Sequence, residues 1–174
     1  MTRISRDEWG LRLAEVVARR ATCLRRSVGC VLTDARGHIL STGYNGRAAG
    51  LPHCDERKYH QDIEKHSFVE LPLDGIGVTL WTWPYACPGA ASPSGTDLDA
   101  CEAIHAESNS LLQCRDVWNI HTCYVTVSPC VSCVKLLLNT SAERIVFRAP
   151  YAHDEAARKL WGRDWKCIPK EDDL

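Results

Sequence analysis

The chain has 174 residues, and its 21 lysines and arginines nearly balance its 22 aspartates and glutamates, giving a net charge of −1 at pH 7. This length is enough for one domain with a full hydrophobic core. A pI of about 6.6 argues against a polyanion-binding surface, because nucleic-acid-binding domains usually have a pI above about 9. We therefore expect no nucleic-acid partner.

The sequence also argues against a membrane or secreted protein. No apolar run approaches the roughly 20 residues of a membrane span, and the first residues lack the apolar part of a signal peptide. The chain has 10 cysteines, which in a chain of this size without an export signal are more typical of reduced thiols and metal ligands than of disulfides. The sequence predicts a cytoplasmic protein without a membrane partner.

A helix and a hairpin are expected at the N-terminus. Residues 5–8 read Ser-Arg-Asp-Glu, a capping-box pattern that predicts a helix start. The apolar residues expected to form the buried face of this helix are Trp9, Leu13, Val16 and Val17. Residues 28–33 and 38–42 then flank a turn that ends at Gly37, which predicts a β-hairpin.

The rest of the chain alternates helical and strand patterns around one irregular segment. The elements expected after the hairpin are a helix over 101–114, a strand over 122–127, a helix whose first residue is Pro129, a strand over 144–147, a helix over 154–160 and a strand near 165–168. This order predicts an α/β fold with a mixed sheet covered by helices. Residues 46–100 are too long for an ordinary connection, so we expect a single domain over 1–174 with an insertion there, including a helix over 55–69.

Two motifs predict a metal centre. The first is His105-Ala106-Glu107, and the second runs from Pro129 through Cys130 to Cys133 with the pattern P-C-x-x-C. One imidazole and two thiolates supply the three ligands of a catalytic zinc site, whose fourth position is left to water. Glu107 is then the candidate general acid and base. Alone, the C-x-x-C pattern fits a redox dithiol as well as a metal site, and the H-x-E pattern favours zinc.

The expected helix starts suit these ligands. His105 is expected in the opening turns of the 101–114 helix, and Cys130 and Cys133 on one face of the next helix. Helix N-termini lower the pKa of cysteine thiols, so both sulfurs are favoured as thiolates.

Further segments add a more specific pattern: residues 22–26, 28–30, 41–46, 50–52 and 105–109. Together with the metal motifs, which are the signature of zinc-dependent nucleobase deaminases, they resemble the deoxycytidylate (dCMP) deaminases of the cytidine deaminase superfamily. The resemblance covers about residues 5–152 apart from much of the insertion. It implies a three-layer α-β-α fold and a zinc-dependent hydrolysis of dCMP to dUMP and ammonia, which supplies thymidylate synthesis. Glu107 would take a proton from the attacking water and pass it to ring nitrogen N3.

The resemblance also implies substrate contacts. Asn45 would contact the sugar or base, the backbone of Ala106 the pyrimidine, and Ser128 would line the site. Arg26 and Tyr151 are the candidates for the phosphate side. Each has a simpler interpretation, because Arg26 could be a solvated charge, Asn45 a turn residue and Tyr151 a core residue.

A second, structural zinc is implied by the same resemblance. The candidate ligands are Cys23, Cys54, Cys87 and Cys101, with His53, and less so His60 or His66, as substitutes. Four thiolates would close a tetrahedral structural site, and Cys101 is expected one helical turn before His105. The alternative is four free thiols.

Several alternatives stay open at this point. A tRNA adenosine deaminase shares both metal motifs, but the acidic pI and the C-terminal Glu171-Asp172-Asp173-Leu174 argue against it. A non-enzymatic zinc module would leave Glu107 without a task, and deoxycytidine, dCTP or 5-substituted dCMP are possible substrates. The resemblance further implies a homo-oligomer, commonly a hexamer, with dCTP and dTTP as effectors.

Overall fold

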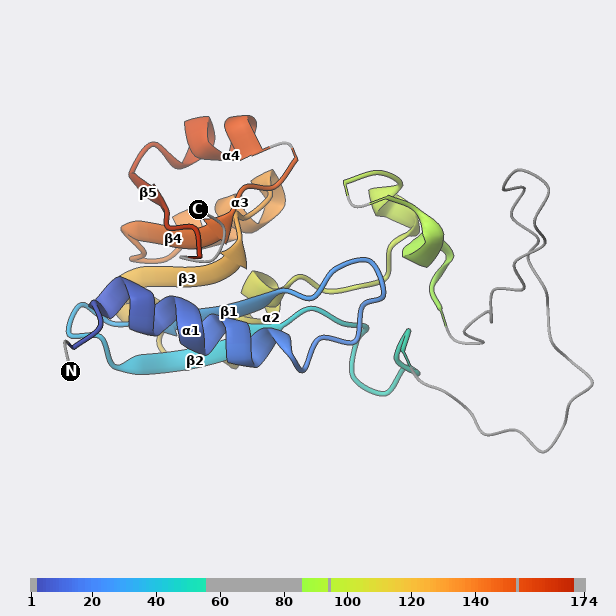
Figure 1. Cartoon of the computed structure of the whole chain (residues 1–174), viewed down its shortest axis with the longest axis horizontal. Coiled ribbons are helices and arrows are strands. Elements are labelled where there is room, and N and C mark those ends of the chain that lie inside the picture. Colours follow the sequence, from blue (N-terminus) through green and yellow to red (C-terminus); the bar gives the residue numbers. More distant parts are fainter. Residues whose placement is uncertain (1–2, 56–85, 94, 153, 171–174) are drawn as a thin grey trace, which may run out of the picture.

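The computed structural model describes residues 3–55, 86–93, 95–152 and 154–170 (Figure 1). Its elements in chain order are α1 (Arg6–Ala18), β1 (Gly29–Thr33), β2 (Ile39–Tyr44), η1 (Pro88–Ala91), η2 (Leu98–Ala100), α2 (Ala106–Gln113), η3 (Val117–Asn119), β3 (Thr122–Val127), α3 (Val131–Leu138), β4 (Arg144–Ala149), α4 (Asp154–Trp161) and β5 (Asp164–Cys167). Of the helix predicted over 55–69, only residue 55 is described, so this prediction lies outside the described residues.

The five strands form one mixed sheet in the order β2-β1-β3-β4-β5. β1 runs antiparallel to both β2 and β3, whereas β3, β4 and β5 run parallel. The mixed α/β sheet predicted from the sequence is confirmed, and each predicted strand is present to within two residues at either end.

The two faces of the sheet carry separate apolar clusters. Alternate residues along the strands point to opposite faces, so Val31, Tyr124 and Val146 pack with α1. Their chain neighbours Leu32 and Val125 belong to the larger cluster on the other face, which the second half of the chain completes with residues from α2, α3 and α4. The fold therefore has three layers, α-β-α, and Figure 1 shows α1 lying along β1 and β2.

A glycine in β2 lets α2 lie directly against the sheet. A Cβ atom at Gly43 would lie 2.3 Å from both the Ala106 carbonyl oxygen and the Ser110 nitrogen, a distance that no side chain tolerates. One turn further along α2, the Ser110 hydroxyl is hydrogen bonded to the Ser41 hydroxyl at 3.0 Å. This close approach fixes the start of α2, which carries the H-x-E motif, relative to the sheet.

The structure corrects the starts of the two motif-bearing helices. α2 begins at Ala106, not at residue 101, and His105 is its N-cap. Residues 101–105 are not helical, and Ile104 pairs instead with Gly46 through two backbone hydrogen bonds of 2.8 and 3.2 Å. The expectation that Cys101 lies one helical turn before His105 is therefore wrong. α3 likewise begins at Val131 with Cys130 as its N-cap, so Pro129 precedes the helix.

The first helix has its predicted cap, and its predicted buried face is confirmed in part, because Leu13 and Val17 pack against the apolar cluster on this side of the sheet. The Ser5 hydroxyl accepts a hydrogen bond from the Glu8 backbone N–H at 3.0 Å, as the capping box predicts. Val16, however, is 61% exposed, and the buried residues of α1 are Gly10, Leu11, Ala14 and Ala18. The helix packs so closely on the sheet that mostly small residues fit at the contact, and a pattern search for large apolar side chains underweights them.

Within the described residues, no helix has the length and apolar character needed to cross a membrane.

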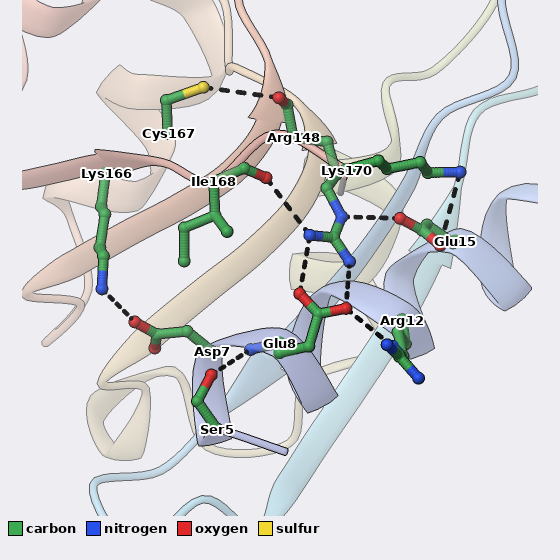
Figure 2. Close-up of polar contacts among 10 residues, drawn as sticks. All are labelled: Ser5, Asp7, Glu8, Arg12, Glu15, Arg148, Lys166, Cys167, Ile168 and Lys170. Carbon is green, nitrogen blue, oxygen red and sulfur yellow. Dashed lines mark hydrogen bonds and ion pairs between the residues drawn. The ribbon is translucent and has the colours of Figure 1, made fainter. Parts of the chain in front are cut away.

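A network of charged groups ties α1 to β4 and to the C-terminal segment (Figure 2). Arg148 is 9% exposed as a residue and donates to Glu8 at 2.9 Å, to Glu15 at 2.7 Å and to the Ile168 carbonyl at 3.3 Å. The hydrogen bond from Arg148 lowers the pKa of Glu8 to about 2. A buried guanidinium with its acceptors in place is stable, but losing one acceptor is costly.

This network predicts a pH-dependent stability. Because the pKa of Glu8 is about 2 in the folded protein and 4.5 ordinarily, the carboxylate stabilises the fold above about pH 4.5, and the contribution is lost as the pH falls toward about 2. We expect Glu8→Gln to lower the free energy of unfolding by about 1–2 kcal/mol at pH 7, with the difference from wild type shrinking to near zero around pH 2. Urea denaturation followed by circular dichroism measures it, with Glu143→Gln, whose side chain is 70% exposed, as the control. A difference that stays constant with pH would contradict the assignment.

Candidate active site

Three side chains meet where α2 and α3 begin. His105 is the N-cap of α2, Cys130 the N-cap of α3, and Cys133 lies in the first turn of α3. The His105 Nδ1 atom is 3.3 Å from the Cys133 sulfur and 3.5 Å from the Cys130 sulfur. Among the described residues this is the one group of three or more metal-ligating side chains whose ligand atoms all lie within 4.8 Å of one another.

The chemistry of this donor set fits zinc. The hydrogen bond from Cys133, together with His105, lowers the pKa of Cys130 to about 4, so this sulfur is a thiolate at neutral pH. The same Cys130 contact, together with burial, raises the pKa of Cys133. Two sulfurs and one imidazole nitrogen within 4.8 Å of one another match the ligands that Zn²⁺ prefers, and a three-ligand set leaves one position open.

Glu107 lies beside the ligand group without belonging to it. It is 4% exposed, in the first turn of α2, and the group of mutually close ligand atoms does not include it. Burial raises the pKa of its carboxyl above the ordinary value, and its carboxylate is hydrogen bonded to the Cys133 side chain. A buried carboxyl next to a three-ligand site has the position of a general acid and base.

A pocket opens from this centre. His105, Glu107 and Cys130 line it together with every residue that the sequence predicted to contact substrate. Those predicted residues are Arg26, Asn45, Ala106, Ser128 and Tyr151. The sequence predictions for the site therefore converge on one cavity, although the individual contacts to substrate stay predictions.

The polar atoms of Asn45 bond to the protein itself. Its Oδ1 accepts from the Val28 N–H at 2.7 Å, and its Nδ2 donates to the Arg26 carbonyl at 2.7 Å. The residue is 7% exposed. Asn45 therefore holds the backbone of the loop that carries Arg26 into the pocket wall.

Ser128 has a matching role on the part of the pocket wall that carries Tyr151. Its hydroxyl accepts from the Tyr151 backbone N–H at 2.7 Å and donates to the Asp154 carboxylate at 3.3 Å. These bonds fix the turn between β4 and α4, which places Tyr151 at the pocket. Asp154, which the sequence did not single out, thus helps to hold this wall.

Arg25 and Gly95 also line the pocket, although neither was predicted as a substrate contact. Arg25 lines the pocket together with Arg26. Burial raises the pKa of the Tyr151 phenol, and the positive charges of the two arginines act to lower it. The pair of adjacent arginines was a signal for Arg25. Gly95, from the predicted insertion, also lines the pocket, and nothing in the local sequence marks it.

The four cysteines of the predicted second site lie near one another in a chain of contacts. Cys54 and Cys87 are 1% and 4% exposed. The Cys87 side chain is hydrogen bonded to Cys54 and to Cys101, and Cys23 acts electrostatically on Cys54. Their sulfurs do not form a group within 4.8 Å in the described part of the chain, as the first site does. Of the substitute ligands, the Nδ1 atom of His53 is 3.2 Å from the Thr22 hydroxyl, and His60 and His66 lie outside the described residues.

A comparison with protein-family models decides the family. The model described as "Cytidine and deoxycytidylate deaminase zinc-binding region" matches residues 4–149. The chain belongs to this family. Membership agrees with the His105, Cys130 and Cys133 cluster, which is compatible with the zinc site of a zinc-binding deaminase domain.

Similar proteins of this family include enzymes from phage and yeast. The chain is 34% identical to a deoxycytidylate deaminase of Mycobacterium phage D29 over 84% of this chain and 97% of that protein. It is 29% identical to a deoxycytidylate deaminase of Schizosaccharomyces pombe over 91% of this chain but only 41% of the yeast protein. The chain thus spans less than half of the yeast relative and nearly all of the phage one.

A solved structure confirms the deaminase-like fold. The dCMP deaminase of cyanophage S-TIM5, crystallised with dCMP and dUMP, superposes with a TM-score of 0.62 over 97% of this chain and 100% of that chain, at 19% identity. At this identity the likeness concerns the fold, and it agrees with the three-layer architecture described above.

Proposed function

We propose that this protein hydrolyses dCMP to dUMP and ammonia. The observation that carries the proposal is the buried Glu107 beside the His105, Cys130 and Cys133 group at one pocket, in a chain that belongs to the deaminase family. The deoxycytidylate deaminases of the phage and the yeast, the second much longer than this chain, support the choice of substrate.

The residues of the pocket divide the chemistry. His105, Cys130 and Cys133 would hold zinc, which when bound supplies an activated water for attack on a ring carbon. Glu107 would receive a proton from that water and deliver it to N3 of the cytosine and then to the departing amino group. Its burial excludes bulk water, so protons pass between the carboxyl and the substrate.

The polar end of the pocket suits a phosphate. Arg26 supplies a guanidinium and Tyr151 a phenol there. The positive charges of Arg25 and Arg26 are close enough to lower the pKa of this phenol. Because Asn45 and Ser128 fix the backbones that carry these side chains, the two groups can be held ready for a single anionic group. A 5′-monophosphate is the part of dCMP that matches them.

A panel of four substrates tests the proposal. Purified zinc-loaded protein is offered dCMP, deoxycytidine, dCTP and CMP separately, and the ultraviolet change of cytosine deamination is followed. We expect turnover of dCMP well above the other three. Preference for dCTP or a 5-substituted dCMP would redirect the substrate within the same chemistry, whereas no activity on any cytosine compound, with dCTP also present as a possible activator, would contradict the proposal and make tRNA adenosine the next substrate to test.

A second zinc on Cys23, Cys54, Cys87 and Cys101 is part of the same proposal. Its support is the chain of sulfur contacts, together with the pKa of the Cys87 thiol. Burial acts to raise this pKa, but hydrogen bonds from the Glu102 backbone, Cys54 and other groups bring it below its ordinary value, which favours the thiolate. A structural zinc would join the segments before and after residues 56–85.

Zinc content per chain tests this second site. We expect about two zinc ions per purified wild-type chain by elemental analysis and about one in Cys54→Ala, since one missing thiolate opens a four-ligand structural site. The remaining zinc of the variant should still be lost when Cys133 is also replaced. A wild-type ratio of one, unchanged in Cys54→Ala, would show that the four thiols are free.

Other expectations from the family resemblance are kept as proposals. They are a single deaminase domain over 1–174 with its insertion at 46–100, a homo-oligomer such as a hexamer, regulation by dCTP and dTTP, and a cytoplasmic location. Size-exclusion chromatography with light scattering, and rate measurements with each effector, test the second and third.

A further inference from the structure

Arg25 joins the insertion to the rim of the pocket. Its Nη2 atom donates to the Thr96 carbonyl at 2.7 Å and also to the Pro93 carbonyl. Both acceptors are backbone groups of the insertion, about 70 residues further along the chain. A guanidinium nitrogen of this kind carries two N–H bonds, and both are committed to these carbonyls.

The part of the insertion that Arg25 holds is braced from within. The Pro93 carbonyl also accepts from the Thr96 backbone N–H at 3.1 Å and from the Thr96 hydroxyl at 2.8 Å. The Ser92 hydroxyl donates to the Asp97 carboxylate at 2.8 Å. Pro93 and Thr96 therefore form the ends of a tight turn, and Arg25 bonds to both ends at once.

This turn forms one wall of the pocket. Gly95 lies within it and lines the pocket together with Arg25, Arg26 and Tyr151. Because Arg25 contacts Pro93 and Thr96, this part of the wall lies beside the two arginines of the pocket. At this end the proposed substrate would place its 5′-phosphate.

We propose that Arg25 is a positioning residue that clasps the 93–96 turn over the phosphate end of the pocket and so restricts the substrate to a nucleoside monophosphate. The inference rests on the proposed function. Arg26 and Tyr151 bind the phosphate, while the clasped turn limits the space beyond it, so that a triphosphate is rejected by shape. The insertion thereby becomes a determinant of specificity.

The selectivity of the variant Arg25→Met tests this role. We expect the ratio of kcat/KM for dCMP to that for dCTP to fall roughly tenfold, as expected for the loss of one or two charge-assisted hydrogen bonds, while zinc content is unchanged. Ser92→Ala, which loosens the turn without touching the pocket, should move the ratio in the same direction by less. Arg26→Met should instead reduce the preference for dCMP over deoxycytidine and leave dCTP rejected.

A second measurement does not depend on activity. Asp97 directly follows the turn and is hydrogen bonded across it to Ser92, so cleavage at Asp97 by an Asp-specific endoproteinase reports how firmly the turn is held. We expect Arg25→Met to be cut several times faster at Asp97 than wild type, and Arg36→Met, an exposed arginine of the hairpin, to be cut at the wild-type rate.

The outcomes separate the clasp from the proposed function. If wild type deaminates no cytosine nucleotide, the proposed function fails and the proteolysis alone decides whether the clasp exists. If wild type deaminates dCMP but Arg25→Met shows an unchanged dCTP ratio and a lost preference over deoxycytidine, Arg25 binds the phosphate and the clasp is overturned. Unchanged cleavage at Asp97 would overturn it as well.

Discussion

Glu107→Gln is expected to keep its zinc and to lose between about a hundredfold and ten-thousandfold of dCMP turnover, the usual contribution of a general acid and base. The amide has nearly the same shape as the carboxyl, so it fits the buried position next to Cys133. It cannot receive the proton that the reaction must move. The expected loss is therefore in kcat, with little change in KM.

Single-turnover rates and zinc content of the same preparations measure this. Glu155→Gln, the same chemical change on an exposed residue of α4, should match wild type in both. A Glu107→Gln protein that keeps more than about a tenth of the wild-type rate, well above the usual range for losing such a group, would remove Glu107 from the proton-transfer role. Loss of zinc in the same variant would instead make it a ligand.

Cys133→Ala is expected to lose zinc and activity together. The sulfur of Cys133 is 3.3 Å from the His105 nitrogen and belongs to the close ligand group, so its removal leaves two ligands where a catalytic site needs three. Loss of a residue that only hydrogen bonds to a metal ligand lowers metal affinity by about 10- to 100-fold. Because Cys133 would be a ligand itself, we expect zinc affinity to fall by more than about 100-fold. Competition with a chelator measures the affinity.

The matched control is Cys123→Ala. Cys123 is fully buried in the sheet, with its sulfur 3.6 Å from that of Cys30, and it lies outside the ligand group. The variant loses a buried thiol as Cys133→Ala does, so it should share any loss of stability but bind zinc normally. Equal zinc affinity in the two variants would mean that Cys133 is not a ligand.

The metal-ligating residues could be predicted from the sequence because their residue types and spacing are the features that identify such a site. His105, Cys130 and Cys133 were predicted as one site, and they meet within 4.8 Å. The strands were predictable for a related reason, since a run such as residues 122–127 is buried on both faces and so keeps an apolar pattern that local sequence reveals.

What the sequence could not supply were contacts between distant segments. The start of α2 was placed too early because the pairing of Ile104 with Gly46 leaves no local trace. Asn45 lines the pocket as predicted, but its hydrogen bonds to the loop at 26–28 could not be predicted from the sequence. The meeting of Arg25 with Pro93 and Thr96 likewise depends on how the chain returns to the pocket.

The most direct test of the central claim is the stoichiometry of the reaction on dCMP. Zinc-loaded wild-type protein is incubated with dCMP, and dUMP is quantified by chromatography while ammonia is measured in the same samples. The account predicts one ammonia for each dUMP formed, with both products absent once a chelator has removed the zinc. Loss of dCMP without dUMP, or equal product formation by the zinc-free protein, would contradict it.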